Sequence, residues 1–151
     1  MHVYSGYHRF GGREVCHSFG LFPLSTAPGP VQSLSVTFIL ESATYNTELR
    51  TFDISVNISW QLPLFPNGEI ISYGYRLVET SNSSSVIIPN TNITDGLSVV
   101  QNVRVSPFTN YTAVVVAYTT AGSGDSVMEA ALSPEAGKID MLLESCLKSL
   151  C

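Results

Sequence analysis

The clearest pattern in the chain is an alternation of apolar and polar side chains that ends at the single tryptophan. Its apolar members are Ile54, Val56, Ile58 and Trp60, and its polar members are Ser55, Asn57 and Ser59. A period of two places each kind of side chain on its own face of a β-strand. Pro63 and Pro66 then end the strand, Asn67-Gly68 supplies a turn, and a second alternating run follows. The stretch 53–75 therefore predicts two successive strands.

Other apolar or alternating runs predict the remaining strands. They span residues 34–40, 86–88, 97–105, 111–119 and 126–132. Pro89 is expected to end the strand at 86–88, and polar residues 41–51 predict a long connection. Val99 and Val100 are adjacent, so the inward face of the strand at 97–105 stays open. About seven short strands with no helix among them predict an all-β, immunoglobulin-like, two-sheet antiparallel β-sandwich.

The chain divides into three segments. Residues 1–27 show no clean periodicity and predict a disordered tail or the remnant of a preceding domain. A proline-rich linker signal at 27–30 opens the predicted sandwich, residues 28–137. In residues 138–151 the apolar positions recur at helical spacing, which predicts a short amphipathic C-terminal helix. This tail is open to three interpretations: docking on the domain, binding of a partner, or non-native sequence from a faulty gene end.

Composition narrows the class of protein. Charged residues make up 13% of the chain and the formal net charge is −5, so nucleic acid and anionic membrane are not expected partners. No run reaches the roughly 18 apolar residues that span a bilayer. The N-terminus lacks the apolar core of a signal peptide. Because other features favour an extracellular location, we expect a fragment of a longer secreted or membrane protein.

The residues that most often carry chemistry lie outside the predicted domain. The cysteines are Cys16, Cys146 and Cys151, an odd number, and we expect free thiols. His8, Cys16 and His17 do not match zinc-site spacing. All three histidines are in the N-terminal tail, so none can join a catalytic set on the sandwich. The sequence therefore predicts no enzyme, no metal and no cofactor.

Several motifs in order resemble the fibronectin type III family. The motifs are Trp60-x-x-Pro63, Asn67-Gly68-x-Ile70-x-x-Tyr73, Val105-x-Pro107-x-Thr109-x-Tyr111 and Ala121-Gly122-x-Gly124. They resemble, in turn, the B-to-C region, the E-to-F corner and the F-to-G loop of that family, over roughly residues 28–137. Val105 replaces the usual leucine. The segment between strands A and B is longer than expected, and would reshape one end of the sandwich or extend an A–B hairpin.

The resemblance implies structural roles for particular residues. Fibronectin type III topology places Trp60 between the sheets, and Tyr73 and Val115 are expected in the same core. Tyr111 occupies the tyrosine-corner position, where the hydroxyl bonds to backbone upstream. The family needs no disulfide between the sheets, which agrees with the absence of cysteine from 28–137.

Two kinds of surface feature are candidates for function. Four N-x-[ST] sequons predict glycosylation, most strongly in loops: Asn82, Asn92, Asn57 and Asn110. Four residues are expected on the outer face of the sheet that contains strands C and F, as a possible protein interface: Val114, Val116, Tyr118 and Val78. Ser123-Gly124-Asp125-Ser126 lacks the arginine of an integrin-binding motif, so integrin binding is not predicted.

The leading functional hypothesis is a non-enzymatic protein-binding or spacer module of a cell-surface adhesion, matrix or receptor protein. Protein partners would bind through loops or the outer sheet face, and membrane attachment would come only from other parts of a longer chain. One alternative is an ectodomain fragment of a receptor tyrosine phosphatase or kinase. Another is an intracellular structural module. Fold alone does not choose among them.

Overall fold

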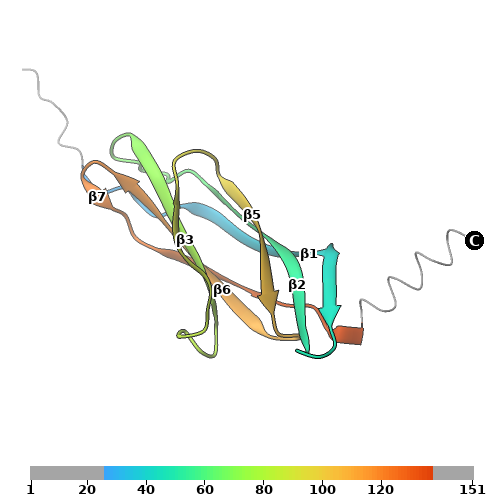
Figure 1. Cartoon of the computed structure of the whole chain (residues 1–151). Helices are drawn as coiled ribbons and strands as arrows, with labels where there is room; N and C mark the ends of the chain where they lie inside the picture. The colour runs from blue at the N-terminus through green and yellow to red at the C-terminus, as the bar shows by residue number, and fades with distance from the viewer. Residues whose placement is uncertain (1–25, 138–151) are drawn as a thin grey trace, which may run out of the picture.

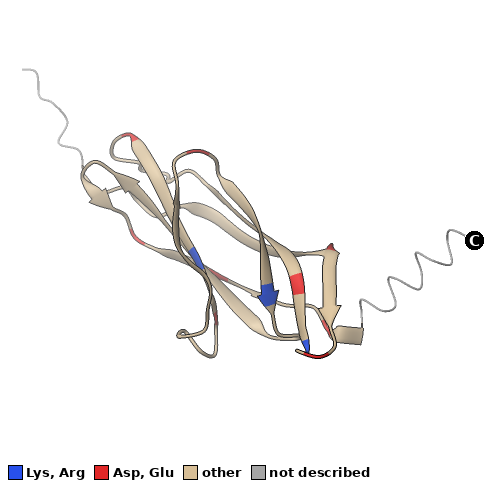
Figure 2. Ribbon diagram, in the orientation of Figure 1, with Lys and Arg blue, Asp and Glu red and all other residues tan. Residues whose placement is uncertain are grey.

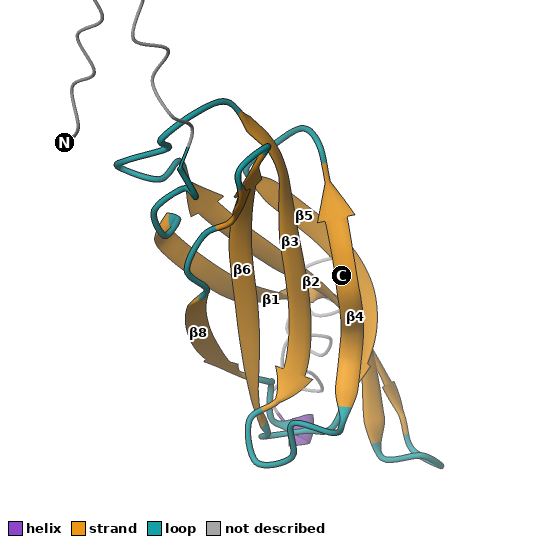
Figure 3. Cartoon of the chain, turned by 90° about the vertical axis from the view of Figure 1, so that its left-hand side faces the viewer, coloured by secondary structure: helices purple, strands orange, loops and turns teal. Residues whose placement is uncertain are grey.

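The computed structural model describes residues 26–137, which form eight strands in two antiparallel sheets (Figure 1). The strands are β1 (Gln32–Asn46), β2 (Thr51–Gln61), β3 (Ile70–Glu79), β4 (Val86–Ile93), β5 (Ser98–Val105), β6 (Asn110–Thr119), β7 (Gly122–Ser123) and β8 (Val127–Leu132). Within this range only residues 136 and 137 have helical geometry (Figure 3). The predicted helical tail, residues 138–151, and most of the predicted N-terminal tail lie outside the described residues.

The strands are divided between two sheets. One sheet has the order β1-β2-β5. In the other, β4 pairs with β3, β3 pairs with β6, and both β7 and β8 pair with β6. The break between β7 and β8 accounts for the eighth strand. The predicted all-β antiparallel sandwich is therefore confirmed.

The alternation in β2 produces the centre of the core. Phe52, Ile54, Val56 and Ile58 have no exposed surface, and Trp60 is almost completely buried. The Trp60 ring packs against Tyr73 of the opposite sheet, with centroids 5.4 Å apart. Tyr111 and Val115 from β6 are buried in the same cluster. These aromatic and branched side chains join the two sheets through apolar burial.

Some polar atoms in the core have a hydrogen-bond partner and others do not. Among the described residues, neither the Trp60 indole N–H nor the Tyr73 hydroxyl has a hydrogen-bond partner. Burial raises the pKa of Tyr73 above its usual value because the charged phenolate would lose its hydration. Tyr75 differs, because Gln101 Nε2 donates a hydrogen bond to its hydroxyl at 2.6 Å, from one sheet to the other.

The prediction of a long polar connection at 41–51 is wrong. β1 continues to Asn46, and Thr44, Tyr45 and Asn46 pair with the start of β2, so the extra residues extend the hairpin between the first two strands. A bulge between Ile39 and Thr44 bends β1 (Figure 1). The Ser42 hydroxyl donates to the Ile39 carbonyl at 2.7 Å and accepts from the Ser55 N–H at 2.8 Å. The sequence did not reveal this strand because only Ala43 and Tyr45 of the extension pack against the core, among polar neighbours.

The predicted end of the fourth strand at Pro89 is also wrong, because β4 runs through Pro89 to Ile93. β4 is an edge strand that pairs only with β3, and the register shifts between the pairs Leu77–Ile88 and Tyr75–Thr91. A proline is tolerated there because its missing N–H is not needed by a second neighbour.

Pairing with β2 decides the inward face of β5, which the sequence left open. Val99, Gln101, Val103 and Val105 face the core, while Val100 is 62% exposed. Val105 pairs with Phe52 and Val99 with Ile58, so the register of β2 selects one of the two adjacent valines.

Candidate interaction surfaces

The outer face of the sheet formed by β4, β3, β6 and β8 carries the four residues predicted as an interface. Val116 and Tyr118 are partly exposed, but Val78 is only 8% exposed and Val114 only 6%. Neither buried valine belongs to the cluster between the sheets, so both are covered from the outer side. Val114 pairs across the ladder with Arg76 and Met128, whose longer side chains flank it. The four predicted residues therefore offer less accessible surface than the alternation suggested.

Two residues on this face that were not predicted from the sequence are more exposed than Val78 and Val114. Met128 on β8 is 59% exposed and Val86 on β4 is 53% exposed. Val86 pairs with Val78 and Met128 pairs with Val114, so the two exposed side chains border the buried valines on both sides. Extending the period of two to residues 126–132 would have identified Met128, since it shares a face with Ala130 and Leu132. We call Val78, Val86, Val114, Val116, Tyr118 and Met128 the outer-face patch.

Gly74 allows Tyr118 to lie across the outer face of β3. A Cβ at position 74 would be 3.0 Å from Tyr118 Cε2 and 3.0 Å from Asn92 Oδ1. Both contacts are tighter than a side chain normally tolerates. The absence of a side chain at Gly74 therefore lets two neighbouring strands place a ring and an amide over it, and this packing orders one end of the outer-face patch.

The four predicted glycosylation sites differ in accessibility. Asn82, Asn92 and Asn110 are exposed, whereas Asn57 is partly buried on the central strand β2. Asn82 lies in the turn between β3 and β4, where its Oδ1 accepts a hydrogen bond from the Ser84 N–H at 3.2 Å. A glycan would be carried by the side-chain nitrogen of Asn82. Because Oδ1 is the atom bonded to Ser84, that nitrogen is directed away from the Ser84 backbone.

Residues 26–30 precede β1 and lie against two loops at one end of the sandwich. The Gly29 N–H donates to the Phe65 carbonyl at 2.8 Å, and Asn67 Nδ2 donates to the Ala27 carbonyl at 3.0 Å. Pro28 is buried. On the other side, a Cβ on Gly124 would approach the Pro28 carbonyl oxygen to 2.4 Å. We call residues 26–30 the entry segment, and it is clamped between the loop after β2 and the β7–β8 region.

Hydrogen bonds order the Ala121–Gly124 loop beside the entry segment. Ser123 and Gly122 pair with Tyr118 and Thr119, and the Gly124 N–H donates to the Ala117 carbonyl at 2.9 Å. Gly124 is required by close contact with the entry segment, so the Ser-Gly-Asp-Ser stretch has a structural reason to contain glycine.

The same end exposes a short apolar loop. Leu62, Leu64 and Phe65, between β2 and β3, are all more exposed than buried. They lie beside the entry segment, because Phe65 itself accepts the hydrogen bond from Gly29. Exposed apolar clusters of this kind mark contact surfaces more often than isolated apolar residues do.

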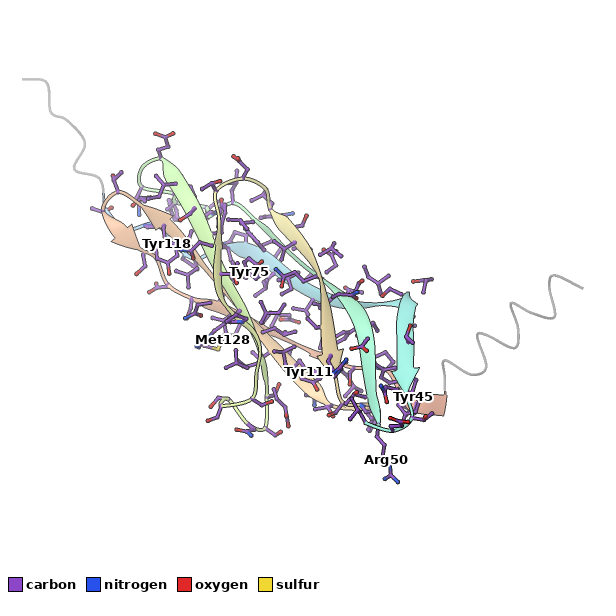
Figure 4. All side chains as sticks on the ribbon, in the orientation of Figure 1. Tyr45, Arg50, Tyr75, Tyr111, Tyr118 and Met128 are labelled. Carbon is purple, nitrogen blue, oxygen red and sulfur yellow. The ribbon has the colours of Figure 1, made fainter. Side chains whose placement is uncertain are left out.

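The opposite end contains the tyrosine corner and the tip of the extended hairpin. The Tyr111 hydroxyl accepts a hydrogen bond from the Ser106 N–H at 2.8 Å. The Asn46 side chain accepts from the Leu49 N–H at 2.9 Å within the turn at the hairpin tip, and Arg50 has a φ of 53°. Figure 4 shows Arg50 pointing away from the domain, whereas Tyr75 lies between the sheets.

Charge is sparse over the described surface. Figure 2 shows acidic and basic positions scattered along the ribbon without a single-sign face. The ion pair within residues 26–137 joins Arg104 and Asp53, which face each other across β5 and β2 at 2.9 Å. Asp53 raises the pKa of Arg104 by hydrogen bonding and by charge. Such an exposed pair contributes little to stability.

Residues 26–137 offer neither a cluster of metal ligands nor a helix that could span a membrane. No group of three or more histidine, cysteine or acidic residues within 26–137 could hold a metal ion. No helix in that range is long and apolar enough to cross a membrane. Cys16, Cys146, Cys151, His8 and His17 lie outside the described residues, and the predictions about their thiols and metal binding stay predictions.

Part of the chain is similar in sequence to a known protein. No family model matches the chain. The chain is 33% identical over 87 residues to "Tyrosine-protein phosphatase Lar" of Drosophila melanogaster, a match that covers 56% of the chain and 4% of the relative. The chain thus corresponds to a small part of that protein's length.

Two solved structures with TM-scores above 0.5 share the fold, and a third is similar at a lower score. A redesigned β-sandwich protein is 17% identical with a TM-score of 0.51, over 71% of this chain and 96% of that one. Domains A168-A170 of titin are 18% identical with a TM-score of 0.51, over 72% of this chain and 33% of that one. The FN5 domain of Drosophila Lar is 23% identical with a TM-score of 0.47, over 73% and 100%.

The observed fold agrees with the resemblance that the motifs indicated. The strand order, the buried tryptophan and the tyrosine-corner hydrogen bond are those that the resemblance implied. The chain contains a fibronectin type III-like domain.

Proposed function

We propose that the chain is a protein-binding or spacer module of an extracellular cell-surface protein, most closely of the receptor-phosphatase kind. The observation that carries this proposal is the 33% identity to Lar over 87 residues, a stretch that is 4% of that relative. A match of this extent fits one module among many in a longer chain. In this function the domain itself is not an enzyme.

Two structural features support a spacer role. The entry segment is clamped by hydrogen bonds from Gly29 and Asn67 and by the close approach of Gly124, so a preceding module would be held without a flexible hinge at this point. The sandwich is joined internally by apolar burial from both sheets. A rigid module with a fixed entry sets a defined distance between its neighbours.

The outer-face patch supports a protein-binding role. It combines exposed Met128 and Val86 with partly exposed Tyr118, without a strong charge of either sign. A single small patch of this type binds weakly, so function would depend on several modules acting together.

The extracellular location is tested by glycan occupancy. Native protein would be treated with an endoglycosidase and its intact mass compared before and after. We expect a mass loss that maps to exposed Asn82, Asn92 or Asn110, with Asn57 the least occupied. An unchanged mass would favour the intracellular structural alternative.

Binding through the outer-face patch is tested by a matched pair of variants. Tetramers of the chain would be applied to intact cells and to cells stripped of surface protein. Met128→Asp should reduce binding, because it places a charge in the patch. Val100→Asp is the control, since Val100 is similarly exposed on the outer face of the other sheet. Equal binding by both variants would reject the patch as the interface.

A further inference from the structure

The turn after β2 contains the chain's single Asn-Gly pair, Asn67-Gly68. Both residues are exposed, and their φ angles are 53° and 149°. A glycine is favoured at such a positive φ because it has no Cβ to clash with the neighbouring backbone. The same missing Cβ leaves the Gly68 nitrogen open to approach from the Asn67 side chain. The turn therefore combines a backbone need for glycine with two residues that can react with each other.

The Asn67 side chain also holds the entry segment. Its Nδ2 donates to the Ala27 carbonyl at 3.0 Å. The neighbouring contacts of the clamp are the backbone hydrogen bond from Gly29 to Phe65 and the close approach of Gly124. Those two contacts are made by backbone atoms, which keep their chemistry as a protein ages. The Asn67 contact depends on a primary amide, so it can be changed by a chemical reaction without any substitution.

The Gly68 nitrogen is available for that reaction, because the Gly68 N–H donates to no backbone carbonyl of residues 26–137. Attack of this nitrogen on Asn67 Cγ forms a C–N bond and closes a five-membered imide. The Cγ–Nδ2 bond breaks, and the proton of the Gly68 N–H leaves with Nδ2 as ammonia. Water then adds to either imide carbonyl and opens the ring to aspartate or to isoaspartate. Water is the one co-reactant that the reaction needs.

We propose that Asn67-Gly68 is a deamidation site whose reaction releases the entry segment. In either product a carboxylate takes the place of the amide, and a carboxylate accepts hydrogen bonds but has none to donate. Its oxygens cannot bond to the Ala27 carbonyl, and they repel it. Isoaspartate also inserts an extra backbone atom into the turn that carries the Phe65 carbonyl. Each product therefore weakens the clamp, and the change accumulates in one direction as the molecule ages.

The consequence for a spacer module rests on the proposed function. In such a module, release of the entry segment would turn a fixed entry into a hinge. Deamidation and release are properties of the chain by itself, so they can be measured whether or not the chain acts as a spacer. Failure of either one would leave the spacer function standing, and the reverse is also true.

Ageing of the full chain tests the site. The purified chain would be kept at physiological temperature and pH, and its peptides compared by mass over time. We expect the peptide that contains Asn67 to gain the mass of an NH₂-to-OH exchange, with isoaspartate at residue 67. Asn90 and Asn102 are internal controls, because both are exposed and each is followed by a residue with a side chain. Modification of Asn67 no faster than that of the two controls would overturn the proposal.

Amide exchange tests the release. Asn67→Asp installs one product directly, and the Gly29 amide should then exchange on the order of fivefold faster, as expected for loss of one supporting hydrogen bond. Asn90→Asp is the matched control, since it makes the same change at an exposed position on β4 and should leave Gly29 exchange unchanged. The Trp60 amide, which donates to the Leu97 carbonyl at 2.9 Å, reports on the fold and should be unchanged in both variants.

The aged chain completes the test. Its isoaspartate-containing fraction should show the same faster exchange of the Gly29 amide as Asn67→Asp. Unchanged Gly29 exchange in either sample would mean that the clamp does not depend on the Asn67 amide, and would contradict release. Equal acceleration of the Gly29 and Trp60 amides would assign the effect to opening of the whole domain, and would also reject the proposal.

Discussion

The two ends of the sandwich are built differently. At one end the entry segment is held by the backbone hydrogen bond from Gly29, by the side-chain hydrogen bond from Asn67, and by a glycine, Gly124, that leaves no room for a side chain. At the other end the hairpin between β1 and β2 is extended, with a bulge held by Ser42, and the corner after β5 exposes Phe108. The first end therefore fixes the direction of the incoming chain, while the second carries the extension of the hairpin between β1 and β2.

The largest expected effect comes from the core that joins both ends. Trp60→Ala removes a buried ring that contacts Tyr73 and Tyr75, and should lower the free energy of unfolding by about 3–5 kcal/mol. Denaturant unfolding followed by backbone and tyrosine signals would measure it. Both ends should lose structure in one transition. If the extended hairpin kept its exchange protection while the rest unfolded, the two ends would be independent units.

Gly124→Val tests the clamp at the entry end. Its Cβ would come within 2.4 Å of the Pro28 carbonyl oxygen, and forcing the entry segment aside should cost about 2 kcal/mol. Gly137→Val is the control, because nothing lies within 4 Å of a Cβ there. Thermal unfolding should separate the two variants, and faster amide exchange at residues 26–30 should appear only in Gly124→Val. Equal stability would mean that the entry segment moves freely.

Tyr111→Phe tests the opposite end. It deletes the acceptor of the Ser106 N–H, and should cost about 1.5 kcal/mol because the donor is left near buried surface without its partner. Tyr45→Phe serves as the comparison, since it retains the ring contact with Phe52 at 4.9 Å. Urea unfolding would measure both. A similar loss of unfolding free energy in the two variants would show that the effect comes from removing any tyrosine hydroxyl, and not from losing the corner hydrogen bond.

The smallest effect is expected at the hairpin bulge. Ser42→Ala removes two hydrogen bonds that connect Ile39 and Ser55 across the bulge, and should cost about 1 kcal/mol because water can replace part of them. The change should be accompanied by faster exchange of the Ser55 amide. Ser35→Ala, on the same strand before the bulge, should have less effect. An unchanged Ser55 amide would mean that the bulge is held by the strand pairing alone.

Much of the fold was predictable because its signals are local. The alternation in β2, the turn residues after Trp60 and the apolar run in β6 each predicted a strand without knowledge of its neighbours. The candidate surface was predicted less well. Val78 and Val114 were placed on the correct strands, but their burial depends on Arg76, Met128 and other residues that only strand pairing brings beside them.

The sequence by itself determined an all-β sandwich, because a period of two and the positions of proline and glycine are properties of short stretches of chain. Only the tertiary structure decided the extent of β1, the face of β5 and the need for Gly124. In β1, polar residues pair because β2 offers an edge to them. In β5, the register with β2 selects Val99 over Val100. At Gly124, the constraint is the Pro28 carbonyl, almost a hundred positions away in the chain, and such contacts leave no local pattern to read.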